Sequence, residues 1–109
     1  MAKHEFGIMD RTPVSKERYD CYEPEKYKTI FVEDELLEPL HKRLNDIDFF
    51  WHSLDVPGKG LAYCGITLIP PESMDAAVKI LEEEPKLVEL KKLLLKAKEK
   101  NKFVIHYGL

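Results

Sequence analysis

The stretch over residues 47–70, IDFFWHSLDVPGKGLAYCGITLIP, constrains the fold of this chain more than any other. Its Phe, Trp, Ile, Leu and Thr residues favour a half-buried β-sheet surface, and the Pro-Gly-Lys-Gly of residues 57–60 interrupts them as a turn does. The pattern therefore predicts a β-hairpin with these four residues as its loop. In that register Trp51 lies opposite Ile66.

Side chains alternate along a strand, so the predicted hairpin has two different faces. One face is typical of a core and carries Phe49, Trp51, Ser53, Cys64, Ile66 and Leu68. The other mixes aromatic and polar groups and carries Phe50, His52, Leu54, Tyr63, Gly65, Thr67 and Ile69. The second face is either covered or contacted by something else, and a slip of one residue would exchange the two sets.

With 109 residues the chain is long enough to bury a sizeable core, and we expect one domain over residues 1–109. Its 44% hydrophobic and 34% charged residues are typical of a soluble globular protein. The net charge of −3 argues against general affinity for nucleic acid, because such affinity depends on an excess of Lys and Arg. We therefore expect no nucleic-acid partner.

Cys21 and Cys64 are too few and too far apart for a disulfide scaffold, and no zinc-type Cys and His spacing is present. They predict two free thiols in a reducing cytoplasm. The N-terminal sequence MAKHEFGIMD lacks the basic start and apolar run of a signal peptide, and no run of about eighteen apolar residues occurs. We expect a cytoplasmic protein without membrane contact.

The N-terminal part, residues 1–27, is predicted to be an extension. Residues 5–9 form a short apolar run with a glycine, which indicates a strand at a sheet edge. Residues 10–27 show neither helical nor strand period, yet contain three tyrosines. Because disordered segments are poor in aromatic residues, we expect this segment to be an ordered loop on the protein surface.

The remaining elements follow from hydrophobic spacing and helix-end signals. Residues 28–32 are predicted to be a strand, followed by a helix that begins at Leu36 or later because Pro39 fits only the first turn. Ser73 is the expected N-cap of a short helix, and a second helix follows Pro85. Residues 102–107 form the closing strand. The lysines near the second helix are interpreted as a solvated face; they are Lys91, Lys92, Lys96, Lys98, Lys100 and Lys102.

Leaving out the extension, the order is βαββαβ, which predicts a ferredoxin-like sandwich. This is an α+β fold in which the helices cover one face of an antiparallel sheet. Residues 28–32 and 61–69 would be the central strands, and residues 49–54 and 103–107 would be the edges. Many unrelated functions share this fold, so it does not select one.

The chain also resembles a group of short, uncharacterised bacterial proteins. The resemblance depends on FGIM near the start, GLAYCGITLIPPES in the middle and NKFVIHYGL at the end, and it covers most of the length. It implies a bacterial cytoplasmic origin. It implies no activity, cofactor or site residue.

Catalytic and metal-binding chemistry is not indicated by the spacing of reactive side chains. His52 lies close enough to Cys64 in sequence to suggest a nucleophile pair, but in the predicted register the two point to opposite faces, so Cys64 is interpreted as a buried core residue. His52 and His106 would lie on opposite edges of the sheet, about 14 Å apart at ~4.8 Å per strand, too far to share a metal. His4 and His41 are interpreted as surface residues. We predict no catalytic residue, no metal and no cofactor.

The predicted binding surface is the sheet face that helices leave open. A soluble monomer rarely exposes an apolar patch beyond a few hundred Å². We therefore expect residues 10–27, a second copy of the chain or a ligand to cover this face, and we favour self-association. The candidate binding residues are Phe50, His52, Tyr63, Thr67 and His106 on the sheet, and Tyr19 and Tyr22 from the extension.

Three classes of function remain. The first is a small interaction module that self-associates or binds a small protein partner. The second is a small enzyme or small-molecule-binding domain with a site around His52 and Tyr63, since pockets combine apolar walls with a few polar groups. The third is nucleic-acid binding. Small size, acidic charge and the lack of a catalytic motif favour the first class.

Overall fold

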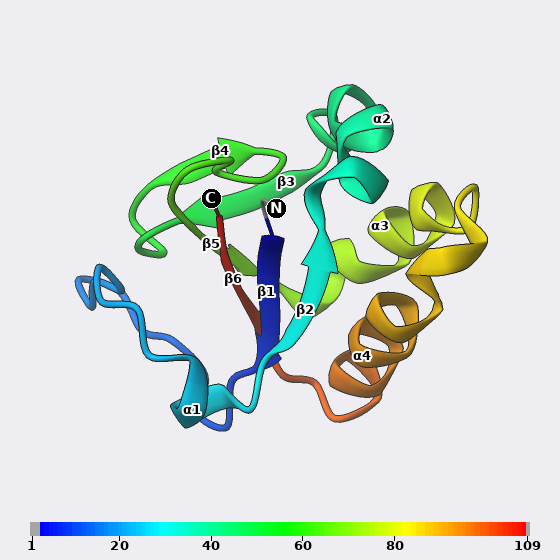
Figure 1. Cartoon of the computed structure of the whole chain (residues 1–109). Coiled ribbons are helices and arrows are strands. Elements are labelled where there is room, and N and C mark those ends of the chain that lie inside the picture. Colours follow the sequence, from blue (N-terminus) through cyan, green and yellow to red (C-terminus); the bar gives the residue numbers. More distant parts are fainter. Residues whose placement is uncertain (1–2, 109) are drawn as a thin grey trace.

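The computed structural model of the chain describes residues 3–108. They form an antiparallel sheet in the order β2-β1-β6-β5-β3-β4, with the three longer helices on one face, so the predicted α+β class is confirmed (Figure 1). The strands are β1 (Lys3–Ile8), β2 (Ile30–Glu33), β3 (Asp48–Trp51), β4 (Pro57–Lys59), β5 (Ile66–Ile69) and β6 (Val104–Tyr107). The helices are α1 (Pro24–Tyr27), α2 (Asp34–Leu44), α3 (Met74–Leu81) and α4 (Val88–Glu99). The predicted domain also included residues 1, 2 and 109, which lie outside the described range.

The predicted helices are present, with one difference at the start of α2. This helix begins at Asp34, so Pro39 lies inside it and not in its first turn. Acidic residues in the first turn and basic residues in the last turn complement the helix dipole. Short 3₁₀ turns, Pro71–Ser73 and Pro85–Leu87, precede α3 and α4, and the Ser73 side chain makes no cap hydrogen bond.

The predicted strand order is wrong. β1 is not an edge strand of an extension: it pairs with β2 on one side and β6 on the other. β6 is therefore an interior strand between β1 and β5, while β2 lies at one edge. In the ferredoxin-like order β2 would lie between β6 and β5, a position that the direct pairing of β5 with β6 excludes. Residues 4–7 of β1 are buried, as expected for a strand between two neighbours.

The predicted hairpin register is also wrong, by one residue. Residues 57–59 are not a loop but form β4, which pairs with β3, and Trp51 lies opposite Thr67 instead of Ile66. Gly58 allows this pairing because a Cβ there would lie 2.4 Å from the Trp51 indole. The shift exchanges the two faces of β5, so that Thr67 and Ile69 point to the helices.

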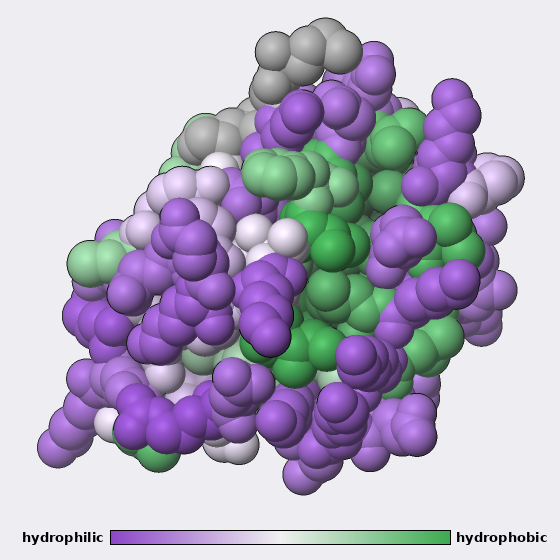
Figure 2. Space-filling view, turned by 60° about the horizontal axis from the view of Figure 1, so that its bottom comes forward, coloured by the Kyte–Doolittle hydropathy of each residue, from purple (hydrophilic) through white to green (hydrophobic). Residues whose placement is uncertain are grey.

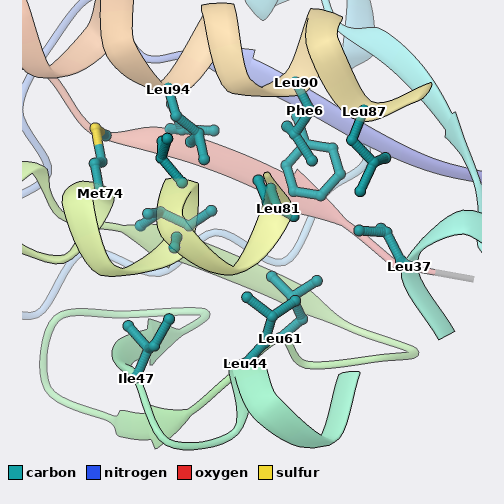
Figure 3. Close-up of a cluster of buried hydrophobic side chains, with 14 of the residues drawn as sticks. Phe6, Leu37, Leu44, Ile47, Leu61, Met74, Leu81, Leu87, Leu90 and Leu94 are labelled. Carbon is teal, nitrogen blue, oxygen red and sulfur yellow. The ribbon is translucent and has the colours of Figure 1, made fainter. Parts of the chain in front are cut away.

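The main core lies between the helices and one face of the sheet (Figure 3). Apolar side chains at helical spacing point inward from α2, α3 and α4, and each buried leucine contributes about 1.5–3 kcal/mol relative to exposure. The residues labelled at this interface include Phe6, Leu37, Leu44, Leu61, Leu81, Leu90 and Leu94. None of the helices within residues 3–108 has the length and apolarity needed to span a bilayer.

The other face of the sheet is covered by the 10–27 segment, which lies on the opposite side from α3 and α4 (Figure 1). Its Tyr19 and Tyr27 pack against a second apolar cluster formed by Met9, Ile66, Leu68, Ile105 and Tyr107. The approach is close at Gly7, where a Cβ would lie 2.8 Å from Tyr27 atoms. One of the three expected covers, the chain's own segment, is therefore present.

Candidate functional site

A buried series of hydrogen-bonded side chains joins three adjacent strands to the start of α2. His4 Nδ1 lies 2.8 Å from His106 Nε2, and His4 Nε2 lies 2.9 Å from Asp34 Oδ1. At the other end His106 Nδ1 lies 3.0 Å from Thr67 Oγ1, which accepts a 2.7 Å hydrogen bond from the Ala62 backbone N–H. We name Asp34, His4, His106 and Thr67 the polar chain.

The sheet register brings the polar chain together. Thr67 on β5 pairs with His106 on β6, and His106 pairs with Phe6 on β1. His4 precedes Phe6 by two residues and therefore shares its face of the sheet. Asp34 directly follows β2, where Val32 pairs with His4. Four segments that are distant in sequence thus meet on the helix-covered face.

One arrangement of protons satisfies every atom of the polar chain when both imidazoles are neutral. The Asp34 carboxylate only accepts, so His4 donates from Nε2 and accepts at Nδ1 from the His106 Nε2–H. His106 Nδ1 then accepts from the Thr67 hydroxyl. All the donors point in one direction, toward Asp34.

Tyr63 and His41 surround the Asp34 end of the polar chain. The Tyr63 hydroxyl donates to Asp34 Oδ1, and its ring meets the His4 ring edge-on at 5.0 Å between centroids. His41 contacts the other side of Tyr63 at 4.6 Å. Among the described residues, His41 Nδ1 is a buried nitrogen with no hydrogen-bond partner. The carboxylate of Asp34 therefore accepts from two side chains at once.

The interior of the polar chain is closed to substrate. His4, His106 and Thr67 are each 0% exposed, whereas the Asp34 side chain is 22% exposed. Burial, and then the nearby His4 and His41, hold the pKa of His106 well below its usual value, as a neutral imidazole requires. The chain can therefore orient Asp34 and Tyr63, but its interior groups cannot contact a ligand.

The structure brings three of the predicted binding residues together, although not on the predicted face. Tyr63, Thr67 and His106 all belong to or contact the polar chain on the helix side. The shifted register and the interior position of β6 account for this difference. Phe50 packs with the second apolar cluster on the opposite face.

Two members of the site, His4 and Asp34, were not predicted, and the interpretation of His4 as a surface residue is wrong. A signal for His4 exists in the sequence, because it shares a strand face with Phe6 and Ile8. Burial of that face implies burial of the histidine. No local pattern connects Asp34 with His4, since their contact depends on strand pairing.

His52 and Tyr19 lie on the side covered by the 10–27 segment. The His52 carbonyl accepts a 2.7 Å hydrogen bond from the Tyr19 backbone N–H, and His52 Nδ1 lies 2.9 Å from Asp20 Oδ1. His52 also has a positive φ of 64°. It therefore helps to fasten the segment to the end of β3. His52 and Tyr63 do not form one site.

A pocket of about 240 Å³ lies between the 10–27 segment and the sheet. Its arginines are paired within the segment, Arg11 with Glu17 at 2.5 Å and Arg18 with Asp20 at 2.9 Å. These local ion pairs leave neither arginine free to select an anionic ligand. Within residues 3–108, no group of three or more His, Cys, Asp or Glu side chains is placed to hold a metal ion.

Tyr22, the last predicted binding residue, covers the same face near β1. Its hydroxyl donates to Glu5, and its ring meets Tyr107 edge-on at 5.0 Å between centroids. The Glu5 carboxylate also accepts from the Thr29 hydroxyl at 2.8 Å. Glu5 is buried, so these bonds satisfy a carboxylate that would otherwise be costly.

Both cysteines, which lie within the described residues, are free, as predicted, but both are exposed. The interpretation of Cys64 as a buried core residue is therefore wrong. Residues 62–65 form the turn that precedes β5, so Cys64 is not part of a strand. Its side chain lines a shallow surface groove together with Tyr63, Trp51 and His41.

A second groove, of about 440 Å³, opens between α4 and the ends of β1 and β2. Its apolar lining includes Ile8, Ile30 and Leu93, and six lysines outnumber the two acids around it. We name this the basic groove; its lysines are Lys26, Lys28, Lys92, Lys96, Lys100 and Lys102. Figure 2 looks toward this side of the molecule and shows hydrophobic surface bordered by hydrophilic side chains.

β2 borders the basic groove and is an edge strand. Within residues 3–108 it pairs with β1 alone. Ile30 faces the groove, while Phe31 points to the opposite face and is 65% exposed. The Phe31 ring contacts the Lys3 ammonium group at 5.5 Å. An aromatic side chain with that exposure beside unpaired backbone groups is unusual for a sheet edge.

Comparison of the chain with protein-family models, with curated proteins and with solved structures finds no match. The function is therefore inferred from the geometry of the polar chain, the covered sheet face, the basic groove and the edge of β2.

Proposed function

We propose that this protein is an interaction module that binds an extended, acidic segment of a protein as an added strand along β2. The observation that carries the proposal is the free edge of β2 with Phe31 65% exposed next to the basic groove. A strand added to β2 would place alternate side chains over Phe31 on one face and into the groove on the other.

The sequence predicts the open sheet face as the interaction surface. Because the 10–27 segment covers that face, a partner would bind at the edge of the sheet instead. The two edges differ. β4 has three residues, begins with Pro57 and carries an ion pair between Lys59 and Asp48 at 2.5 Å. Proline and charge protect an edge from pairing. β2 has four residues, IFVE, and contains no proline.

The positive charge of the basic groove determines which sign of charge a partner would need. Lys92 and Lys96 extend from α4, and Lys26 and Lys28 precede β2. Among the ion pairs of the described residues, a groove lysine takes part in one, between Lys102 and Asp10 at 3.9 Å. Carboxylates on an incoming strand would therefore meet uncompensated lysines, which favours an acidic segment and disfavours a basic one.

The test uses two labelled synthetic peptides, one alternating Val or Ile with Glu and the other alternating the same apolar residues with Lys. We expect fluorescence anisotropy to show binding of the acidic peptide only. The double variant Lys92→Glu/Lys96→Glu should weaken binding about tenfold or more, because it reverses two charges of the groove. The matched control Lys79→Glu/Lys86→Glu makes the same charge change outside the groove and should leave binding nearly unchanged. Equal binding of both peptides, or equal loss in both double variants, contradicts the proposal.

A second candidate function is a small-molecule site at the groove that Tyr63 lines. The polar chain ends at the Tyr63 hydroxyl through Asp34, so an accessible phenol is held by a buried network. Thermal-shift measurements with small polar and aromatic compounds on wild type and Tyr63→Phe test it. A compound that stabilises only the wild type supports this function, and equal shifts in both proteins contradict it.

A further inference from the structure

We infer that the strand bound at the edge of β2 is the β2 of a second copy of this chain, paired antiparallel across a two-fold axis. The inference is based on the proposed function and names its partner. The β2 segment, IFVE, is itself extended and mostly apolar, and acidic residues follow it at the start of α2, which is the chemistry that the β2 edge and the basic groove favour. The chain thus contains a segment of the type that its own edge would bind.

The charges at the two ends of β2 are opposite. Lys26 and Lys28 precede the strand, whereas Glu33, Asp34 and Glu35 end it and begin α2. Antiparallel pairing of two copies places the basic end of one strand beside the acidic end of the other. The same symmetry brings the basic groove of each copy toward the acidic start of the other copy's α2. The electrostatic interactions at both ends of the interface are therefore attractive.

The two-fold axis also fixes the register. An axis perpendicular to the sheet keeps each face continuous, so only residues of the same face lie opposite one another. With Phe31 on the axis, the two Phe31 rings form a cross-strand aromatic pair, and Ile30 lies opposite Val32 of the other copy. Lys28, just before β2, then lies near the acidic start of α2 of the other copy. This register covers the large exposed aromatic side chain of β2 and pairs its charges.

Such a contact is self-complementary and closes at two copies. Both β2 edges are paired in the dimer, and the remaining edges, formed by β4, begin with Pro57, which disfavours further strand pairing. A four-residue strand pair buries less surface than a standard interface, so we expect a reversible dimer that dissociates at about micromolar concentration.

Analytical ultracentrifugation of the full chain over a range of about 1–500 μM tests the inference, since that range brackets the expected dissociation constant. Wild type should shift from monomer to dimer. Phe31→Lys places two like charges on the axis and should remain monomeric, whereas Val14→Lys, a matched change at a residue that is 58% exposed in the 10–27 segment, should still dimerise. A wild type that stays monomeric throughout, or equal behaviour of the two variants, overturns the inference.

Charge-reversal and cysteine variants distinguish a specific strand register from non-specific association. Lys28→Glu brings a like charge to the acidic end of the other copy and should weaken the dimer, whereas Lys28→Arg keeps the charge and should leave it nearly unchanged. In a Cys21→Ser/Cys64→Ser background, Phe31→Cys should form an intermolecular disulfide, because directly opposite residues lie within disulfide reach. Val14→Cys should not. Equal dimerisation of Lys28→Glu and Lys28→Arg, or equal crosslinking at positions 31 and 14, contradicts the antiparallel register.

The peptide assay distinguishes failure of this inference from failure of the proposed function. If the acidic peptide binds and dissociates the dimer, both are supported. If the peptide binds and no dimer forms, the partner is another protein and the inference alone fails. If neither binding nor dimerisation occurs, both fail.

Discussion

His4 and His106 face each other in the interior of the protein, with 2.8 Å between Nδ1 of His4 and Nε2 of His106, although 102 positions separate them in sequence. Both side chains are fully buried. Two buried imidazoles in direct contact repel each other if both are protonated, so at least one of them is neutral. Asp34 and Thr67 satisfy the outer nitrogens, so the pair needs no water.

The first prediction concerns acid stability. Burial lowers the pKa of His106 in the folded protein, so the unfolded state binds more protons below its ordinary pKa of about 6.5. The contribution of His106 to stability is therefore complete above about pH 6.5 and is lost as the pH falls toward the folded-state pKa. His106→Gln should reduce the acid-side slope of the unfolding free energy by up to about 1.4 kcal/mol per pH unit.

Urea unfolding at several pH values between 5 and 8 measures this slope, a window that brackets the ordinary histidine pKa of about 6.5. His52→Gln is the matched control, because His52 is not part of the polar chain. If wild type and His106→Gln show parallel curves, the pKa of His106 is not lowered in the folded protein.

The second prediction concerns the hydroxyl of Thr67. Thr67→Val keeps the shape but leaves the Ala62 N–H and His106 Nδ1 without partners, so we expect a loss of about 2 kcal/mol or more. Thr67→Ser keeps the hydroxyl and should cost less than about 1 kcal/mol. The two unfolding free energies are compared by urea titration. A Val variant as stable as the Ser variant would show that the hydroxyl is not needed to complete the polar chain.

The elements of the fold were largely predictable from local sequence, but their arrangement was not. The spacing of apolar residues predicts α2, α3 and α4, and the apolar runs predict β2, β3, β5 and β6. Strand order depends on pairing between distant segments. The short apolar run of β1, with its glycine, would look the same in sequence whether the strand lay at a sheet edge or in the interior. Only its pairing with both β2 and β6 shows that it is an interior strand.

The candidate site shows how one error of register affects every side chain on a strand. The Pro-Gly-Lys-Gly sequence indicated a turn, yet Gly58 pairs with Phe49 in β4. The resulting shift of one residue moved Thr67 to the helix-covered face, where it meets His106. Tyr63 joined the same site through Asp34, a contact that no spacing in the sequence indicates.

The third prediction concerns thiol reactivity. Cys21 and Cys64 are both free and exposed, so both should react with iodoacetamide in the native protein at rates close to those in urea. Mass spectrometry after timed quenching gives the two rates separately. Slow native labelling of Cys64 together with fast labelling of Cys21 would mean that the turn over residues 62–65 is packed more closely than the structure shows.

The last prediction concerns the cover of the second sheet face. Burial, and then the 2.6 Å hydrogen bond to Glu17, raises the pKa of Tyr19 to about 12, and burial raises the pKa of Tyr107 to about 12. A phenol whose folded-state pKa is raised stabilises the fold below its unfolded pKa of about 10, and this contribution is lost as the pH rises toward 12.

We therefore expect the 10–27 segment to detach from the sheet between about pH 10 and 12, before the main core unfolds, because the helix-covered cluster contains no tyrosine. Phenolate absorbance should show Tyr19 and Tyr107 titrating near pH 12, and Tyr19→Phe should remove one of these two late steps. If all five tyrosines titrate together near pH 10 while far-ultraviolet circular dichroism stays native, Tyr19 and Tyr107 are open to water and the segment does not cover this face.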